Sequence, residues 1–243
     1  MSPTPTTPTE PATVSSDRKL IVALDTLDVA QARTWADAVA PHAGLLKLGL
    51  EFYLANGAAG VAAITGAPIF LDLKLHDIPN TVAGGVRAVL KLRPAMLTIH
   101  AAGGAAMIQA AHQAAMAAGA DRPMILAVTV LTSLDQPALN AIGVPTTPAE
   151  QVLRLGRLAI EAGADGLVCS PLEIPMLRQA LGQSVKLVVP GIRPEGSAAG
   201  DQARTLTPAQ AVAAGADWIV VGRPITQEAD PATSAASIAA AIR

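Results

Sequence analysis

Short apolar runs alternate with Ala-rich amphipathic stretches along the chain from residue 18 to its end. An apolar run of strand length that is bounded by turn residues indicates a buried strand, and apolar positions recurring every three to four residues indicate a helix. The pattern predicts strands at residues 19–25, 44–49, 68–74, 95–100, 123–130, 165–170, 186–190 and 217–222. It predicts helices at residues 29–40, 51–65, 80–92, 104–118, 148–162, 171–181, 208–214 and 231–242, with a short additional helix at 137–142.

The predicted strands are apolar on both faces, which is typical of parallel strands covered by helices. Two Ala-Gly-Ala-Asp turns, at residues 162–165 and 214–217, place Gly at a helix end just before a strand. The length of 243 residues suits an eight-stranded α/β barrel. We therefore predict the α/β class and a (β/α)8 TIM barrel, formed as a single domain by residues 17–243. A doubly wound open sheet is the alternative, disfavoured because no Gly-x-Gly-x-x-Gly follows the first strand.

The composition narrows the cellular compartment and the classes of binding partner that we expect for the protein. Residues 1–16 are mostly Pro, Thr and Ser, a composition that predicts a disordered N-terminal extension. This segment has no cationic start followed by an apolar run, so a secretory signal is not predicted. No apolar stretch reaches the length that spans a bilayer. A net charge of −2 argues against a nucleic-acid or anionic-membrane partner. Cys169 is the only cysteine, which fits a reducing, cytoplasmic location.

The third predicted strand carries charged residues into an otherwise apolar region. Alternation along the strand places Asp72 and Lys74 on one face, and Asp77 follows at the start of the next helix, with Pro79 in its first turn. A charged cluster at the end of a core strand is costly unless its members pair or do chemistry. The local sequence leaves both explanations open: a structural ion pair with a helix cap, or a functional site.

The ends of neighbouring strands favour a functional site. Active sites of such barrels lie at the C-terminal ends of the strands. There Asp25 and Lys47, from the first two strands, join Asp72 and Lys74 from the third. Because acids and bases alternate in this set, all four groups can stay ionised in a site that excludes water. A purely structural role for four charges at this end of the barrel is therefore much less plausible.

The loops after the seventh and eighth strands have the composition of a phosphate site, which this fold usually places there. Glycine backbone N–H groups can approach an anion closely, and guanidinium groups match phosphate oxygens. The candidates are Gly191, Arg193, Gly222 and Arg223. The loop at 191–205 is long for such a connection, so we expect a mobile lid in which Gln202 and Arg204 are the reaching polar groups.

No metal site is predicted. His76 and His100 lack the spacing of paired ligands on a helix and are interpreted as structural histidines. Carboxylates near the predicted site could hold Mg²⁺ through oxygen ligands. Lys47 and Lys74 are interleaved among these carboxylates and would repel such an ion. Cys169 is interpreted as a small core residue.

Six motifs in order resemble the orotidine 5′-phosphate decarboxylase family. The stretch from Asp72 to Thr81 is similar to the family's Asp-x-Lys-x-x-Asp signature, and its Ile-Pro-Asn-Thr ending resembles the bacterial form. The other similar motifs are Ala-Leu-Asp at 23–25, Lys-Leu-Gly at 47–49, Val-Leu-Thr-Ser at 130–133, Val-Pro-Gly-Ile-Arg-Pro at 189–194 and Val-Gly-Arg-Pro-Ile at 221–225. The resemblance covers the chain from about residue 20 to the C-terminus.

The resemblance implies cofactor-free decarboxylation of orotidine 5′-monophosphate to UMP, the last step of de novo pyrimidine nucleotide synthesis. It implies that Lys74 delivers a proton to C6 of the pyrimidine as CO₂ leaves, with Asp72 beside the departing carboxylate. Asp25 and Lys47 would hold the ribose hydroxyls and the charge network, and Thr132 would face the pyrimidine.

The resemblance also implies a homodimer with shared active sites. Asp77, Ile78 and Thr81 would reach into the partner's site across the dimer interface. The residues implied at the phosphate end and in lid closure are Arg193, Gln202, Gly222 and Arg223.

Two alternatives to the decarboxylase stay open. One is a barrel relative that acts on sugar phosphates with Mg²⁺, such as a hexulose-phosphate synthase or a keto-gulonate-phosphate decarboxylase. These relatives are similar in the Asp-x-Lys-x-x-Asp signature but carry Glu on the second strand, so Lys47 argues against them. The other is a non-catalytic phosphate-binding barrel whose charges are structural, which the complete four-charge set makes implausible.

Overall fold

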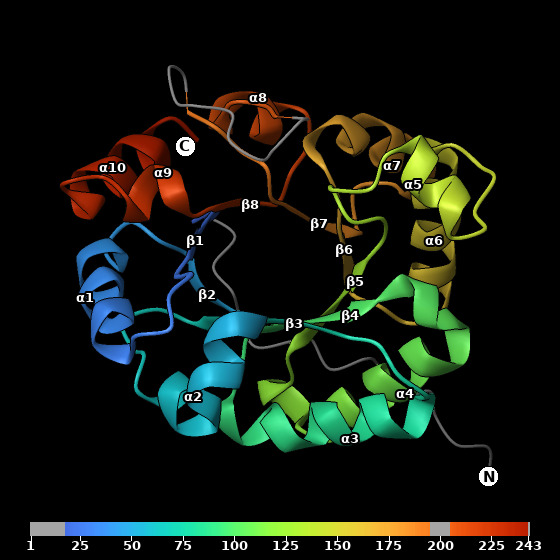
Figure 1. Ribbon diagram of the computed structural model, residues 1–243, viewed down its shortest axis with the longest axis horizontal. Helices are drawn as coiled ribbons and strands as arrows, with labels where there is room; N and C mark the ends of the chain where they lie inside the picture. The colour runs from blue at the N-terminus through green and yellow to red at the C-terminus, as the bar shows by residue number, and fades with distance from the viewer. Residues whose placement is uncertain (1–17, 195–204, 243) are drawn as a thin grey trace, which may run out of the picture.

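The computed structural model describes residues 18–194 and 205–242, and its strands close into a barrel of eight parallel strands in chain order (Figure 1). The predicted (β/α)8 architecture is therefore confirmed. The predicted extension at 1–16 lies outside the described residues. The strands are β1 Leu20–Ala23, β2 Leu45–Gly49, β3 Ile69–Leu75, β4 Met96–His100, β5 Met124–Val128, β6 Gly166–Val168, β7 Lys186–Val189 and β8 Trp218–Val221.

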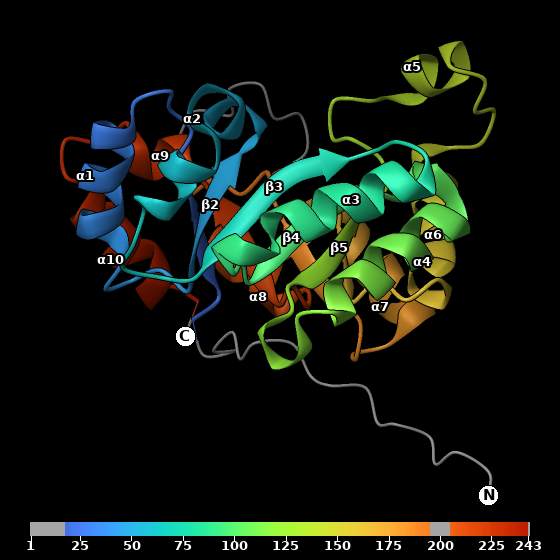
Figure 2. The same ribbon diagram turned by 90° about the horizontal axis from the view of Figure 1, so that it is seen from below.

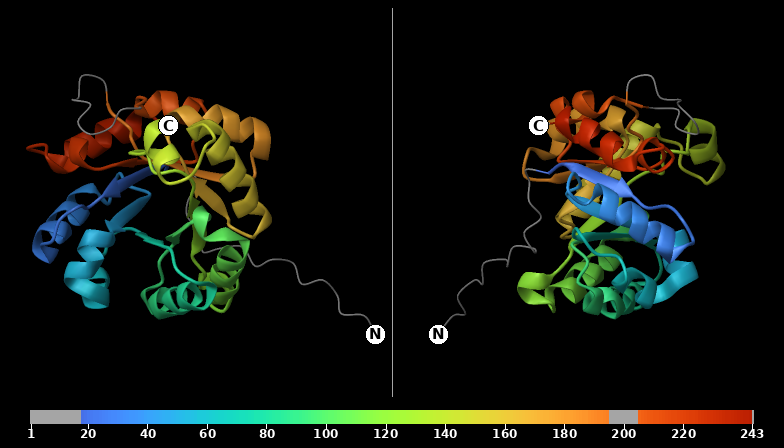
Figure 3. Two further views of the ribbon diagram at one scale, coloured as in Figure 1. Left: turned by 45° about the vertical axis from the view of Figure 1, so that its right-hand side comes forward. Right: turned by 90° about the vertical axis from the view of Figure 1, so that its left-hand side faces the viewer.

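Helices surround the barrel on the outside, as Figures 1 and 3 show from three directions. The helices are α1 Val29–Val39, α2 Leu50–Ala62, α3 Pro79–Val89, α4 Gly104–Met116, α5 Gln136–Ala141, α6 Pro148–Glu161, α7 Ile174–Leu181, α8 Pro208–Ala213, α9 Arg223–Thr226 and α10 Pro231–Ala240. Figure 2 shows that α5, between β5 and α6, stands away from the barrel. The predicted long helices are confirmed within a few residues at their ends. The four-residue helix α9, at the end of β8, was not predicted. Its sequence is too short to show helical periodicity.

Alternation along the strands divides the buried residues into two layers. One cluster fills the barrel interior and includes Phe70, Met96 and Trp218. The other lies between the barrel and the helices and includes Leu71, Leu97 and many small Ala residues. The Ala-rich helices can approach the barrel closely, because an Ala side chain occupies little space. The two layers together fix which side chains of each strand point inward toward the site.

The start of α3 differs from the prediction by one residue. Ile78, not Asp77, occupies the N-cap position, and no side chain caps the helix there. The Asp77 carboxylate instead accepts a hydrogen bond from the Ile78 backbone N–H at 2.6 Å. Pro79 at the first helical position agrees with the prediction, since a proline there loses no helical hydrogen bond.

The aspartate of each Ala-Gly-Ala-Asp turn links neighbouring strands at the N-terminal end of the barrel, through a backbone hydrogen bond and an ion pair. Asp165, before β6, accepts the backbone N–H of Ile125 in β5 at 2.8 Å and a bidentate ion pair from buried Arg122 at 2.8 and 2.9 Å. Asp217, before β8, accepts the N–H of Leu187 in β7 at 2.8 Å and pairs with Arg178 at 2.5 Å. Each aspartate thus joins a pair of strands, β5 to β6 and β7 to β8.

Replacing Asp165 is expected to lower stability. In Asp165→Asn, the buried Arg122 guanidinium loses the charge of the Asp165 carboxylate, and breaking such a buried pair costs about 3 kcal/mol. The measurement is the free energy of unfolding in urea. Asp121→Asn is the matched control, because Asp121 is exposed next to Arg122 and its side chain pairs with no charged group that the structure shows. Equal stability of the two variants would show that this ion pair does not hold the barrel together.

Candidate active site

A cavity of about 260 Å³ lies at the C-terminal ends of the strands, where sequence reasoning placed the site. Its apolar lining includes Phe70, Val188 and Ala23. Most of the predicted site residues line it: Asp25, Lys47, Asp72, Lys74, Thr132, Arg193, Gly222 and Arg223. The structure thus brings together residues from six strands or the loops that follow them, namely β1, β2, β3, β5, β7 and β8.

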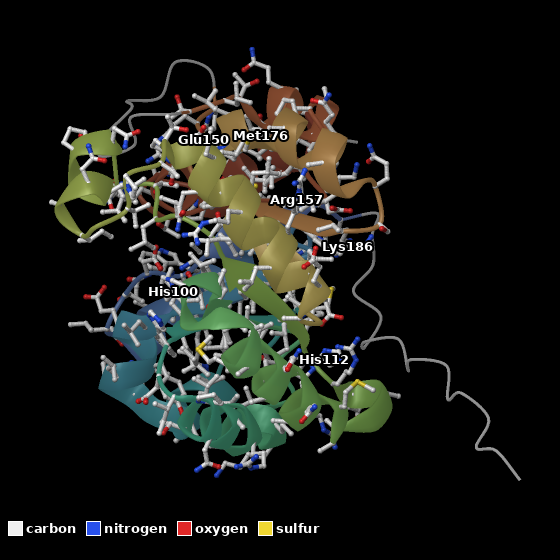
Figure 4. All side chains as sticks on the ribbon, turned by 90° about the vertical axis from the view of Figure 1, so that its right-hand side faces the viewer. His100, His112, Glu150, Arg157, Met176 and Lys186 are labelled. Atoms are coloured by element: carbon white, nitrogen blue, oxygen red, sulfur yellow. The ribbon has the colours of Figure 1, made fainter. Side chains whose placement is uncertain are left out.

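A larger open groove of about 680 Å³ lies elsewhere, on the outside of the barrel between α4 and α6. Figure 4 shows Glu150 and Arg157 on α6, a helix that covers the outside of the barrel. Its charged side chains come from helix surfaces exposed to solvent. The smaller cavity, where four charged side chains from neighbouring strands converge, is therefore the candidate active site.

The four predicted charges form a continuous chain inside the cavity. Lys47 Nζ lies 3.0 Å from Asp25 Oδ1 and 3.8 Å from Asp72 Oδ2. Lys74 Nζ donates to the same Asp72 oxygen at 2.7 Å. The order Asp25, Lys47, Asp72, Lys74 alternates in sign, so each inner charge has opposite charges on both sides. The Lys47 and Asp72 side chains are only 11% and 14% exposed, so these interactions are weakly screened by water.

The surroundings keep Asp72 ionised. Burial by itself would raise the pKa of its carboxyl group, but Lys47 and Lys74, with hydrogen bonds from Lys74 and Thr98, lower the pKa below the ordinary value of 3.8. Asp72 is therefore a carboxylate at neutral pH despite its burial. A fixed carboxylate held beside two ammonium groups gives the cavity a stable arrangement of charge before any substrate enters.

Thr98, on β4, is a residue that sequence reasoning missed. Its hydroxyl donates to Asp72 Oδ1 at 2.9 Å and accepts the backbone N–H of Lys74 at 2.8 Å. Thr98 itself is fully buried. The only signal in the sequence was a polar residue between the apolar residues 95–97 and Ile99, and its partners lie on another strand.

The loops after β7 and β8 bring the predicted phosphate-site residues Gly191, Arg193, Gly222 and Arg223 to the cavity. Gly191 adopts a positive φ of 79°, a conformation that favours glycine. Arg193 N donates to Leu206 O at 3.0 Å, and Ile192 forms a parallel bridge to Leu206. The two ends of the predicted lid loop are thereby held together beside the cavity. Gln202 and Arg204 lie outside the described residues.

Gly222 leaves space for the Asp25 carboxylate. A Cβ at Gly222 would lie 3.3 Å from Ala23 Cβ and 3.5 Å from Asp25 Oδ2. Arg223 follows directly as the first residue of α9. The turn therefore brings Arg223 to the cavity, and Asp25 reaches the cavity from the loop that follows the neighbouring strand β1.

Asp77, Ile78 and Thr81 do not line the cavity of their own chain. All three are exposed, and Ile78 leaves 66% of its surface open to solvent. They lie at the N-terminal end of α3, immediately after the strand that carries Asp72 and Lys74. The four-charge chain thus lacks the third member of the Asp-x-Lys-x-x-Asp signature.

His76 and His100 pack against each other beside the site, with ring centroids 5.2 Å apart. Burial, with the nearby His76 and Lys74, lowers the pKa of His100 below its usual 6.5, so His100 is neutral at physiological pH. Among residues 18–194 and 205–242, no group of three or more His, Cys, Asp or Glu side chains is arranged to hold a metal ion. In the cavity, the Lys47 ammonium lies between the Asp25 and Asp72 carboxylates.

Residues 18–238 match the Orotidine 5'-phosphate decarboxylase / HUMPS family. The chain belongs to this family. It is 56% identical over 229 residues to the orotidine 5'-phosphate decarboxylase of Gluconobacter oxydans (strain 621H), covering 93% of this chain and 97% of that protein. It is 55% identical over 227 residues to that of Thermobifida fusca (strain YX), covering 92% and 95%.

A solved relative in the decarboxylase family has the same architecture. The crystal structure of orotidine 5'-phosphate decarboxylase from Lactobacillus acidophilus superimposes with a TM-score of 0.83 at 39% identity, covering 93% of this chain and 99% of that chain. The family resemblance seen in the motifs is thereby confirmed. In residues 18–194 and 205–242 of this protein, no helix is both long and apolar enough to cross a membrane.

Proposed function

We infer that the protein decarboxylates orotidine 5′-monophosphate to UMP, the last step of de novo pyrimidine nucleotide biosynthesis, without a cofactor. The observation that carries this inference is the Asp25–Lys47–Asp72–Lys74 chain in the cavity, with Arg193 and Arg223 also at its wall. The cavity offers fixed alternating charges to a reacting centre, and it also offers guanidinium groups to a phosphate. The length and identity of the match to named decarboxylases support the same reaction.

The proposed chemistry needs one proton donor. When the bond from C6 to the carboxylate breaks, its electron pair stays on C6 and CO₂ departs. The Lys74 ammonium then gives a proton to C6, and the resulting amine regains a proton from solvent. An ammonium that Asp72 already holds at 2.7 Å stabilises the developing negative charge without having to reorganise. The Asp72 carboxylate is proposed to lie beside the departing carboxylate.

The remaining cavity residues are proposed to bind and orient the nucleotide. Asp25 and Lys47 would hold the ribose hydroxyls, since both line the cavity between the reacting charges and Gly222. Thr132 would face the pyrimidine. Arg193, Gly222 and Arg223, with Gln202 from outside the described residues, would bind the phosphate. Interactions with a phosphate far from C6 can supply binding energy that orients the reacting end.

A homodimer with shared sites is proposed from the position of Asp77, Ile78 and Thr81. They are absent from their own cavity yet exposed at its side, and an exposed Ile of this extent is suited to burial in an interface. In a two-fold dimer each chain would lend these residues to the other. The cytoplasmic location and the absence of a nucleic-acid partner stay predictions.

A Mg²⁺-dependent sugar-phosphate enzyme, such as a hexulose-phosphate synthase, is not favoured. Its metal would need oxygen ligands where Lys47 reaches between Asp25 and Asp72. An ammonium at this position both repels a cation and occupies the carboxylate oxygens.

The test follows pyrimidine absorbance after orotidine 5′-monophosphate is added, with and without EDTA. We expect conversion to UMP at the same rate in both conditions, because the proposed donor is an amino group. Loss of activity in EDTA would contradict the metal-free mechanism. No conversion in either condition, with protein shown to be folded, would contradict the decarboxylase assignment.

A further inference from the structure

Thr98 lies directly behind the charged residues of β3 and does not line the cavity itself. It is on the inward face of β4, between Met96, in the barrel core, and His100, which Figure 4 shows at the site end of the barrel. The side chain is fully buried. A polar group in such a place has to be satisfied by protein partners.

The partners of Thr98 are the two residues proposed to carry the reaction. A hydroxyl has one proton to donate and lone pairs to accept with. Thr98 gives its proton to Asp72 Oδ1 at 2.9 Å and accepts the N–H of Lys74 at 2.8 Å. The other Asp72 oxygen, Oδ2, is left for the Lys74 and Lys47 ammonium groups. One hydroxyl therefore orients the carboxylate and anchors the backbone that carries the ammonium.

The backbone at this point is unusual. Lys74 has a φ of 49°, in the left-handed region that side chains other than glycine rarely adopt. The pairing of β3 with β4 also shifts here, because Leu71 pairs with Leu97 but Leu75 pairs with Ile99. Residues 72–74 therefore lie opposite Thr98 alone. Such a strained conformation persists only where its surroundings hold it, and the hydrogen bond to Thr98 is a direct contact that does so.

We propose that Thr98 is a positioning residue for the decarboxylation: its hydroxyl sets the Asp72 carboxylate and the Lys74 backbone so that the ammonium is held at the reacting carbon. The expected effect on kcat rests on the proposed function. The expected effect on the Lys74 backbone and on its contact with Asp72 rests on geometry alone. The chemistry itself stays with Lys74 and Asp72, because Thr98 does not reach the cavity.

The kinetic test compares Thr98→Val, which keeps the shape and removes both hydrogen bonds, with Thr98→Ser, which keeps the hydroxyl. We expect kcat to fall about 10- to 100-fold in Thr98→Val, since small misplacements of reacting groups cost rates of this order. KM and the Kd for UMP should change less than threefold, and Thr98→Ser should keep kcat within about threefold of the wild type. Thr129→Val is the matched control, because Thr129 is also buried and its hydroxyl donates to the Val168 carbonyl at 3.3 Å.

A kcat in Thr98→Val equal to that of Thr129→Val would overturn the inference, as would a loss of stability with kcat unchanged. If Thr98→Val does not fold, Thr98→Cys replaces it, because a thiol donates and accepts hydrogen bonds only weakly. A kcat for Thr98→Cys equal to that of Thr98→Ser would then overturn the inference.

Crystal structures of the same variants separate this inference from the proposed function. We expect the positive φ of Lys74 and its contact with Asp72 to persist in Thr98→Ser. Both should be lost in Thr98→Val, or in Thr98→Cys where it replaces Thr98→Val. An unchanged Lys74 in both would overturn the positioning role whatever the activity. If the wild type does not convert orotidine 5′-monophosphate, the proposed function fails, and these structures still decide whether Thr98 positions Lys74.

Discussion

Lys74→Ala is expected to lower kcat for orotidine 5′-monophosphate by about 10⁴-fold or more. The ammonium is proposed both to protonate C6 and to stabilise the charge that develops there, and each role is worth about 10²-fold or more. The variant removes the donor that lies 2.7 Å from Asp72 but leaves Arg193 and Arg223, which also line the cavity, unchanged. The measurement is the change in pyrimidine absorbance, with the Kd for UMP determined in parallel.

Lys91→Ala is the matched control for this variant. Lys91 is an exposed lysine in the short turn of 3-10 helix at Leu90–Leu92, remote from the cavity lining. It should leave kcat unchanged, because removing an exposed charge away from the site alters neither the donor nor the cavity. A decrease of less than tenfold in Lys74→Ala would show that another group protonates C6.

Asp77→Ala is expected to lower kcat by about 10³-fold, although Asp77 does not line the cavity of its own chain. The proposed reason is that its carboxylate completes the charge set in the partner's site. Mixing Asp77→Ala with Lys74→Ala should then restore activity. Random exchange makes about half of the dimers hybrids, and each hybrid has one intact site of two, so about a quarter of wild-type activity should return.

The control mixture combines Lys74→Ala with Lys47→Ala. Both residues line the same cavity, so a hybrid of these two chains has no intact site and should recover nothing. Subunit exchange is confirmed with differently tagged chains. If exchange occurs and the Asp77→Ala mixture recovers no more than this control, the active site is not shared across a dimer interface.

The features that follow from periodicity were predictable from sequence. Strand alternation placed Asp72 and Lys74 on one face, and the usual location of active sites in this fold connected them with Asp25 and Lys47. All four line one cavity. The one-residue error at the start of α3 arose because Asp77 is a good capping residue in isolation, whereas here its carboxylate binds the next N–H outside the helix.

The features that depend on pairing between distant segments were not predictable. The left-handed conformation of Lys74 and its bond to Thr98 arise where β3 and β4 change register, which no local pattern reveals. The arginine partners of Asp165 and Asp217 come from elements far away along the chain. Sequence reasoning recognised the two repeated turns but could not see that each one closes an ion pair.

Those two fastened turns have a consequence for how the protein could be modified. They lie at the N-terminal ends of the strands, and the charges proposed to react lie at the C-terminal ends of the same barrel. Loss or gain of rigidity can therefore be introduced at one rim while the chemistry at the other is left intact. A more heat-resistant variant could therefore carry cross-links at the N-terminal ends of β1 to β4. Among the described residues, no ion pair there corresponds to the Asp165 and Asp217 pairs.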